Sequence, residues 1–260
     1  MVRLIFIWFT IERLVTKLFS SLRTFGFLFG YLPVSLPKLR MIKAQKDKLS
    51  VEEYDKLVHQ VPGAWAAGIL KRTKSTFQVK GIENLPQGPV LIISNHEGNF
   101  DIPTLLAYVP KPFGFISKIE VMKLPLIPKW MVEMNCVFLD RTSRKSSYQS
   151  ILDTITQLQN GHSILIFPEG TRSKGEGMGE FKSGFVRIAK DAQVPIVPIA
   201  IKGTANIMEK NKNKIRPAHV QISILPTYSS MDIQLQETKE TIHILQNMIA
   251  KELEEMNNSN

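Results

Sequence analysis

The chain has 260 residues, 43% hydrophobic and 22% charged, a composition that excludes a disordered chain, collagen and a multi-span transporter. Its single cysteine, Cys136, excludes an internal disulfide and a cysteine-based zinc cluster. The net charge of +10 suits a nucleic acid or a membrane surface. Residues 1–80 carry 14 Lys+Arg and 5 Asp+Glu, whereas residues 81–260 carry 19 and 18. The basic excess is confined to the first third, so we expect an anionic membrane surface as partner and no nucleic acid.

The first 25 residues have the pattern of an amphipathic helix. On a helical projection, residues 3–25 divide into a wide apolar face and a narrow, mostly basic stripe, which is typical of a helix lying among lipid headgroups. A transmembrane helix is not predicted, because the longest charge-free stretch of residues 1–48, Thr24–Pro37, has 14 residues. A spanning helix needs about 20.

A second apolar segment, residues 25–36, is predicted to end at Pro33 and Pro37. Five basic residues and one acid follow in Lys38–Lys48, and each such charge beside an anchor contributes about 1 kcal/mol on an anionic leaflet. We therefore expect a monotopic or peripheral protein at the cytoplasmic face of the cell membrane. The alternative is a buried N-terminal helix followed by a solvated charge run.

The sequence Ser50-Val-Glu-Glu53 is a capping box, which predicts that a helix begins there and ends at Lys71–Lys74. A domain boundary is predicted near residue 75. It separates a helical, basic membrane-association region, residues 1–75, from a second domain, residues 76–260.

The second domain alternates short apolar runs with segments of helical periodicity, which predicts an α/β fold with a largely parallel central sheet flanked by helices. Several runs are continuously apolar, as in strands buried on both faces. The predicted strands are Phe77–Val79, Val90–Ile93, Phe113–Ile116, Val137–Leu139, Ile164–Phe167, Ile196–Ile201 and Val220–Leu225, and the predicted helices include Ser147–Gln159, Ser183–Ala192 and Asp232–Met256.

Polar clusters follow three of these predicted strands. They are Asn95–Asp101, Ser117–Lys118 and Pro168–Ser173. In open α/β sheets ligands bind beyond the carboxyl ends of the strands. We therefore expect the three clusters to meet at one edge of the sheet and form the functional site.

His96 and Asp101 are five residues apart in a predicted strand-to-helix turn. An aspartate that accepts from one imidazole nitrogen leaves the other nitrogen free to act as a base. The chain has no Gly-x-Ser-x-Gly elbow and Cys136 falls in a predicted strand, so the base has no evident protein nucleophile. This favours direct deprotonation of a substrate hydroxyl or of water. The alternative is a structural hydrogen bond.

The segment Glu169-Gly-Thr-Arg-Ser173 combines backbone N–H groups, hydroxyls and a guanidinium, which suits a phosphate. Lys118 and Arg141, near other strand ends, are further phosphate candidates. The alternatives are a simple turn with a surface arginine and solvated single charges. A nucleotide P-loop is excluded by pattern, and we predict no metal ligands.

These residues resemble the glycerolipid acyltransferase family, and within it the bacterial lysophosphatidic acid acyltransferases. The resemblance rests on four ordered blocks, with Gly98 as a departure where serine is common. The blocks are Asn95–Asp101; Ile116–Glu120 with Leu124-Pro125 and Phe138–Arg141; Phe167–Ser173; and Val194–Ala200.

The resemblance implies that His96, oriented by Asp101, deprotonates the free sn-2 hydroxyl of 1-acyl-glycerol-3-phosphate (lysophosphatidic acid). The hydroxyl then attacks an acyl thioester of coenzyme A or acyl carrier protein, giving phosphatidic acid without a resident cofactor. Acylation of glycerol-3-phosphate or another lysolipid, hydrolysis of a lipid ester or thioester, and a non-catalytic membrane-binding role remain alternatives. The implied phosphate-binding residues are Arg172 supported by Glu169, Gly170 and Thr171, with help from Lys118 and Arg141.

Overall fold

The computed structural model describes residues 24, 26–27 and 30–258. The amphipathic helix predicted for residues 3–25 lies outside the described residues apart from Thr24. Within the described part of the chain, no helix is long and apolar enough to cross a bilayer.

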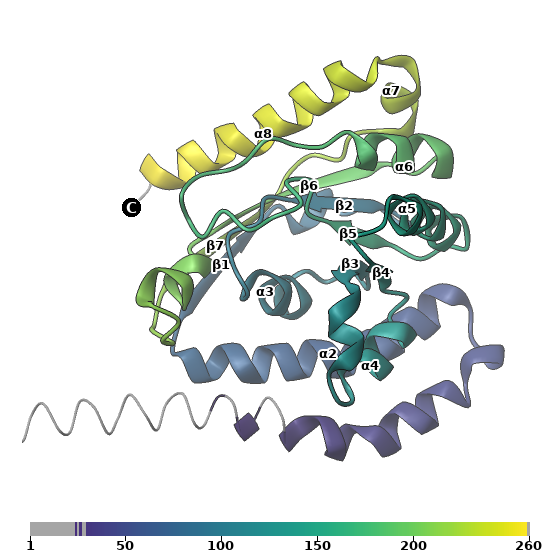
Figure 1. Cartoon of the computed structure of the whole chain (residues 1–260), viewed down its shortest axis with the longest axis vertical. Helices are drawn as coiled ribbons and strands as arrows, with labels where there is room; N and C mark the ends of the chain where they lie inside the picture. Colours follow the sequence, from purple (N-terminus) through teal and green to yellow (C-terminus); the bar gives the residue numbers. More distant parts are fainter. Residues whose placement is uncertain (1–23, 25, 28–29, 259–260) are drawn as a thin grey trace, which may run out of the picture.

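All seven predicted strands are present, and they form one sheet in the order β1-β7-β6-β2-β5-β3-β4 (Figure 1). Every neighbouring pair is parallel except β6 and β7. The largely parallel α/β fold is therefore confirmed. The strands are β1 (Thr76–Lys80), β2 (Leu91–Ser94), β3 (Gly114–Lys118), β4 (Val137–Leu139), β5 (Ile164–Ile166), β6 (Ile196–Lys202) and β7 (His219–Ile224).

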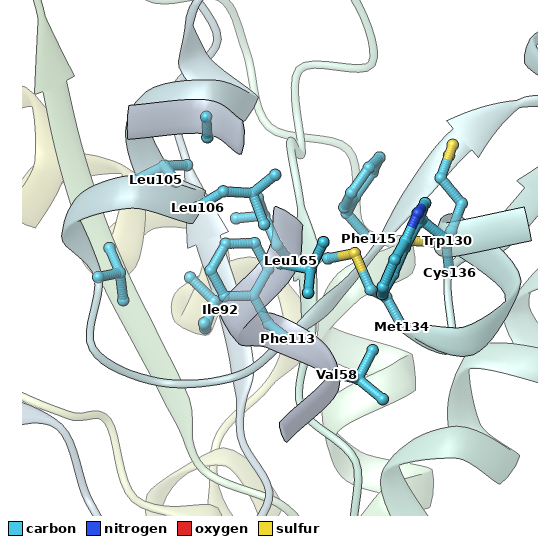
Figure 2. Packing of buried hydrophobic residues seen from close by; sticks show 14 of the residues in the cluster. Val58, Ile92, Leu105, Leu106, Phe113, Phe115, Trp130, Met134, Cys136 and Leu165 are labelled. Carbon is cyan, nitrogen blue, oxygen red and sulfur yellow. The ribbon is translucent and has the colours of Figure 1, made fainter. Parts of the chain in front are cut away.

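Helices cover both faces of the sheet (Figure 1). The side chains of β2 alternate between the two layers, since Ile92 joins the cluster under α2 and α3 while Leu91 and Ile93 join the cluster under α6 and α8. Figure 2 shows the first cluster, in which Val58 of α2 and Leu105 of α3 pack with Ile92 and Leu165 of the strands. The helices are α2 (Val51–Thr73), α3 (Asp101–Tyr108), α4 (Ile127–Glu133), α5 (Arg144–Gln159), α6 (Gly184–Ala192), α7 (Ser230–Leu235) and α8 (Thr238–Asn258), with short 3-10 helices η1 (Lys46–Lys48), η2 (Ile82–Asn84), η3 (Ile119–Lys123), η4 (Thr204–Asn206) and η5 (Glu209–Asn211).

The capping box at the start of α2 is formed as predicted, with Ser50 and Glu53 bonded reciprocally, and α2 ends at Thr73. Gly63 of α2 lies so close to α3 that an added Cβ would be 3.2 Å from the Leu106 carbonyl oxygen. The predicted boundary near residue 75 thus falls between α2 and β1, while α2 and the sheet share one hydrophobic cluster.

Residues 30–43 are helical throughout, so the prediction that Pro33 and Pro37 end the second apolar segment is wrong. The physical reason is packing. Leu32, Leu39 and Ile42, at helical spacing, are buried against the domain, and burial of this face outweighs the low helix propensity of proline.

The single long helix predicted over Asp232–Met256 is also wrong. The chain forms two helices, α7 and α8, because Gln236 takes an extended conformation with ψ of 155° between them. Ser229 caps α7 by accepting from the backbone N–H of Asp232, which starts the helix before the predicted residue.

Candidate active site

The His96 and Asp101 side chains meet in the turn between β2 and α3. His96 Nδ1 lies 2.6 Å from Asp101 Oδ2, and the Asp101 side chain is fully buried. The imidazole stacks on the Phe167 ring with 3.9 Å between centroids, which fixes its plane. Among the described residues, His96 Nε2 has no hydrogen-bond partner, and His96 lines a cavity. The predicted His–Asp geometry is therefore present, with one nitrogen available to a ligand.

The turn is built around Gly98. Its N–H donates to Asp101 Oδ2 over 3.0 Å, and the Asp101 N–H donates to the Gly98 carbonyl. An added Cβ at Gly98 would lie 2.6 Å from Glu209 Oε2, and Glu209 in turn accepts from the Asn99 N–H over 2.7 Å. The Glu209 carboxylate therefore occupies the space beside Gly98 where a side chain would begin.

Two of the predicted polar clusters are joined through their backbones. The Ser173 N–H donates to the His96 carbonyl over 2.8 Å, and the Lys174 N–H donates to the Glu97 carbonyl over 2.9 Å. The loop after β5 thus lies directly against the loop after β2, as expected for parallel strands that are neighbours in the sheet.

Glu169 and Thr171 do not line the cavity, in contrast to the prediction for the phosphate site. The buried Glu169 carboxylate accepts from the His96 backbone N–H over 2.6 Å and from the Gly179 N–H over 2.8 Å. Burial raises the pKa of Glu169, while the two N–H groups act to lower it. The buried Glu169 carboxylate thus accepts from two backbone N–H groups and holds the backbone of His96.

The other four predicted binding residues share one cavity of about 640 Å³ with His96. Arg172, at its edge, donates to the Asn99 side chain. Lys182, which the sequence analysis missed, also lines the cavity, and a Cβ on Gly170 would come within 2.8 Å of its ammonium. Gly170 has φ of +70°, a conformation that favours glycine. The cavity is cationic, which suits an anionic ligand; its basic lining residues are Lys118, Arg141, Arg172 and Lys182.

Lys182 follows the Pro168–Ser173 cluster by nine residues, across a glycine-rich stretch that hides the connection in sequence. One signal was available, because Lys182 stands immediately before the predicted helix at Ser183. A cation at a helix N-terminus is unfavourable by itself, and an anion bound there removes the conflict. In the structure α6 begins at Gly184, and Gly184 also lines the cavity.

A second, apolar cavity of about 430 Å³ adjoins the first. Both cavities are lined by Asn99, Ile102, Phe115, Ser117 and Val121. Most of the other lining residues of the apolar cavity come from helix 30–43, α2, α3 and α4; they include Leu32, Pro62, Trp65, Leu106, Trp130 and Met131. The arrangement offers a cationic compartment beside an apolar one, with His96 lining the cationic one.

Cys136 is not part of this site. It is buried immediately before β4, and burial raises the pKa of its thiol to about 12, so the thiolate nucleophile is suppressed. Among the residues that the structure describes, no group of three or more His, Cys, Asp or Glu side chains could hold a metal ion.

The described site thus combines a His–Asp pair at the carboxyl ends of parallel strands with a cationic cavity and an apolar one. Residues 76–202 match the family model described as Acyltransferase. A probable 1-acyl-sn-glycerol-3-phosphate acyltransferase of Mycoplasma pneumoniae is 33% identical over 186 residues, which cover 66% of this chain and 69% of that protein. The chloroplastic 1-acyl-sn-glycerol-3-phosphate acyltransferase LPAT1 of Arabidopsis thaliana is 39% identical over 51% of this chain and 37% of that protein.

Among solved structures, the 1-acyl-sn-glycerophosphate (LPA) acyltransferase PlsC from Thermotoga maritima shares the fold, with a TM-score of 0.74 and 23% identity over 92% of this chain and 98% of that one. The chain belongs to the acyltransferase family and is an acyltransferase, as the resemblance of its motifs indicated.

Proposed function

We propose that this enzyme transfers an acyl chain from an acyl thioester to the free sn-2 hydroxyl of 1-acyl-glycerol-3-phosphate, giving phosphatidic acid. The observation that carries the proposal is that His96, whose Nδ1 is bonded to Asp101, lines a cavity with four basic side chains, next to an apolar cavity. Lysophosphatidic acid has the matching chemistry, with a phosphate, a hydroxyl and one acyl chain. The relatives' names support the same acceptor.

In the proposed mechanism His96 is the general base. Nε2 takes the proton of the acceptor hydroxyl as its oxygen attacks the thioester carbonyl carbon. Asp101 accepts from Nδ1–H and stabilises the imidazolium that forms. The C–S bond of the tetrahedral intermediate then breaks, and His96 returns the proton to the departing thiolate. The products are the new ester and a free thiol, so no acyl-enzyme forms.

The four basic residues of the cavity are proposed to bind the acceptor phosphate. Arg141 and Arg172 can each bind a phosphate bidentately through the guanidinium. Arg172 is the stronger candidate of the two, because its side chain is held by Asn99. Its contact with the Asn99 side chain holds it at the cavity edge on the same loop system as His96. The Lys182 ammonium lies beside Gly170, where the missing side chain leaves room for it.

The apolar cavity is proposed to hold an acyl chain. Its aliphatic and aromatic lining matches a hydrocarbon, and burial of each methylene contributes about 0.8 kcal/mol. Because the two cavities share part of their walls, a chain in the apolar one lies near the reacting carbonyl and His96.

The test is an assay of the purified chain with 1-acyl-glycerol-3-phosphate, glycerol-3-phosphate and lysophosphatidylcholine, each offered with acyl-coenzyme A and with acyl carrier protein thioester. We expect phosphatidic acid and free thiol in equal amounts, and much less product from the other two acceptors. Thiol release at the same rate without an acceptor would establish a thioesterase instead. Faster acylation of glycerol-3-phosphate would establish the alternative acceptor.

We also propose that the enzyme works at an anionic membrane surface, on the cytoplasmic face, because its acceptor and product are lipids. Helix 30–43 buries Leu32 and Leu39 against the domain but leaves Val34 79% and Met41 67% exposed on its outer side. Exposed large apolar residues on one helix face suit a lipid surface better than water. The basic segment Lys38–Lys48 adjoins this face.

A matched pair of double variants tests the membrane proposal. Val34→Glu with Met41→Glu changes the outer face of helix 30–43, at the bottom of Figure 1. Met231→Glu with Leu235→Glu is the control, since these α7 residues are 71% and 79% exposed at the top of the same view. On vesicles rich in phosphatidylglycerol, the first pair is expected to weaken binding at least tenfold and the control to leave it unchanged. Equal effects of the two pairs would contradict this orientation.

A further inference from the structure

The loop that carries His96 is tied to the end of β6 and the turn that follows it. The Asn95 side chain spans the backbone of Ile201, with its Oδ1 accepting from the Ile201 N–H over 2.9 Å and its Nδ2 donating to the Ile201 carbonyl over 2.8 Å. Glu97 Oε2 accepts from the N–H groups of Gly203 and Ala205 over 2.8 and 3.3 Å. The two loops are therefore positioned by one another.

Thr204 lies at the centre of this junction. Its side chain is fully buried, and its hydroxyl contacts Asp101 Oδ1 closely and Glu97 Oε2 over 3.1 Å. A hydroxyl has one proton to donate, and the shorter contact directs it to Asp101. The other Asp101 oxygen accepts from His96 Nδ1 and the Gly98 N–H. The Asp101 carboxylate thus has three donors, one of which comes from another part of the chain.

The backbone presents this hydroxyl in a fixed position. Gly203 has φ of +97°, and a Cβ there would lie 2.1 Å from the His219 carbonyl oxygen, so the turn is packed tightly on β7. Glu97 holds the N–H groups on both sides of Thr204. Threonine is also β-branched, which restricts its χ1 angle. The hydroxyl is therefore preorganised toward Asp101.

We propose that Thr204 is a positioning residue of the acyl-transfer reaction, which orients the Asp101 carboxylate and disperses its charge, and thereby sets the proton affinity of His96. This inference rests on the proposed role of His96 as base. Removal of the Thr204 donor concentrates negative charge on Asp101, which stabilises the imidazolium and leaves less neutral His96 at a given pH.

Several charged groups surround His96 besides Asp101. They comprise carboxylates of the neighbouring loops and the basic residues of the cavity: Glu97, Glu169, Glu209, Lys118, Arg141, Arg172 and Lys182. Substitutions at Thr204 remove none of these charged groups, but they do remove one contact that lowers the pKa of Glu97. A shift of the activity profile with pH therefore reports on the Thr204 hydroxyl through the two carboxylates that it contacts, Asp101 and Glu97.

The experiment measures kcat/KM for acyl transfer against pH in the full chain and in Thr204→Val, Thr204→Ser and Thr204→Cys. Thr241→Val is the control, since Thr241 is a fully buried residue of α8 whose hydroxyl donates to the carbonyl of Glu237, the residue before that helix. We expect Thr204→Val to lower kcat/KM about 10- to 100-fold, because Asp101 loses the bond that orients it toward His96 and bonds to charged groups contribute in this range. We also expect the ascending limb of the pH profile to move to higher pH, because the imidazolium is stabilised. Serine restores both quantities, and Thr241→Val changes neither.

A loss of activity in Thr204→Val without movement of the limb would overturn the inference, as would a serine variant as impaired as the valine variant. If Thr204→Val does not fold, the cysteine and serine variants decide. Because S–H is a weak donor, the cysteine variant must then move the ascending limb of the pH profile further than the serine variant does. Ascending limbs at the same pH in the two variants would overturn the proposal. The variant His96→Ala separates the two proposals. If His96→Ala stays active, the proposed function fails. If His96→Ala is inactive and the pH profile of Thr204→Val keeps its ascending limb in the wild-type position, only this inference fails.

Discussion

Replacement of Asp101 by asparagine removes one charge from a buried site while keeping its shape. The carboxylate accepts from His96 Nδ1 over 2.6 Å, from the Gly98 N–H over 3.0 Å and from the Thr204 hydroxyl. An amide can keep its oxygen toward His96 and Gly98 and place its NH₂ toward Thr204, which can then donate to Glu97 instead. The variant is therefore expected to fold, with the imidazole near its original position.

The expected loss follows from the charge. At an effective dielectric constant of 20, opposite unit charges about 4 Å apart attract by about 4 kcal/mol. Asp101 provides this attraction to the imidazolium that forms in the transition state but not to the neutral base. About 1.4 kcal/mol corresponds to a factor of ten in rate, so kcat is expected to fall about 10³-fold. The aspartate-to-asparagine change in serine protease triads lowers kcat by about 10⁴, which is comparable.

The assay is kcat for phosphatidic acid formation with both substrates saturating, together with the thermal midpoint of unfolding. Asp153→Asn, an exposed residue of α5, controls for the loss of one charge. We expect Asp101→Asn to retain a folded chain with about 10³-fold lower kcat, and Asp153→Asn to match the wild type. A kcat within tenfold of the wild type in folded Asp101→Asn would refute the assignment of Asp101 to the base.

Three further predictions concern the phosphate site, acid stability and the thiol. Arg172→Ala is expected to raise the apparent KM for the lysolipid more than the KM for the thioester, and initial-rate kinetics with the reverse pattern would place the phosphate elsewhere. Burial lowers the pKa of the His59 imidazole from 6.5 to about 4. As the pH falls from 6.5 to 4, His59 is therefore protonated in the unfolded chain but still neutral in most of the native chain, which stabilises the unfolded state relative to the native state. The native chain is thereby expected to lose about 2 to 3 kcal/mol of unfolding free energy between pH 7 and 4.5, measured by urea denaturation, and His59→Leu to lose less; an equal loss in both would exclude His59 as the cause. Cys136, whose thiol pKa is raised to about 12, is expected to resist iodoacetamide at pH 8 until the chain is unfolded, and labelling of the native chain would contradict its burial.

The strands and the His–Asp pair were predictable because they depend on local pattern. Continuous apolar runs such as Ile164–Phe167 have few alternatives to a buried strand, and the four residues between His96 and Asp101 fit one turn into a helix. The order of the strands and the antiparallel β6 and β7 pair were not predicted, since they depend on pairings between distant segments.

The lining of the cationic cavity was predictable only in part, for the same reason. Gly170 and Arg172 line the cavity, whereas Glu169 turns inward and accepts from the backbone N–H groups of His96 and Gly179. That requirement exists only once the loops after β2 and β5 are adjacent. The contact of Thr204 with Asp101 likewise joins residues 103 positions apart, which local patterns do not reveal.

The measurement that tests the central claim most directly compares the wild type with His96→Ala, following phosphatidic acid and free thiol from acyl thioester and 1-acyl-glycerol-3-phosphate. We expect the wild type to form both products in equal amounts. We expect His96→Ala to remain folded and to lose at least about 10³-fold in rate, since base and proton donor are the same group. Transfer by His96→Ala within tenfold of the wild-type rate would contradict the proposed mechanism.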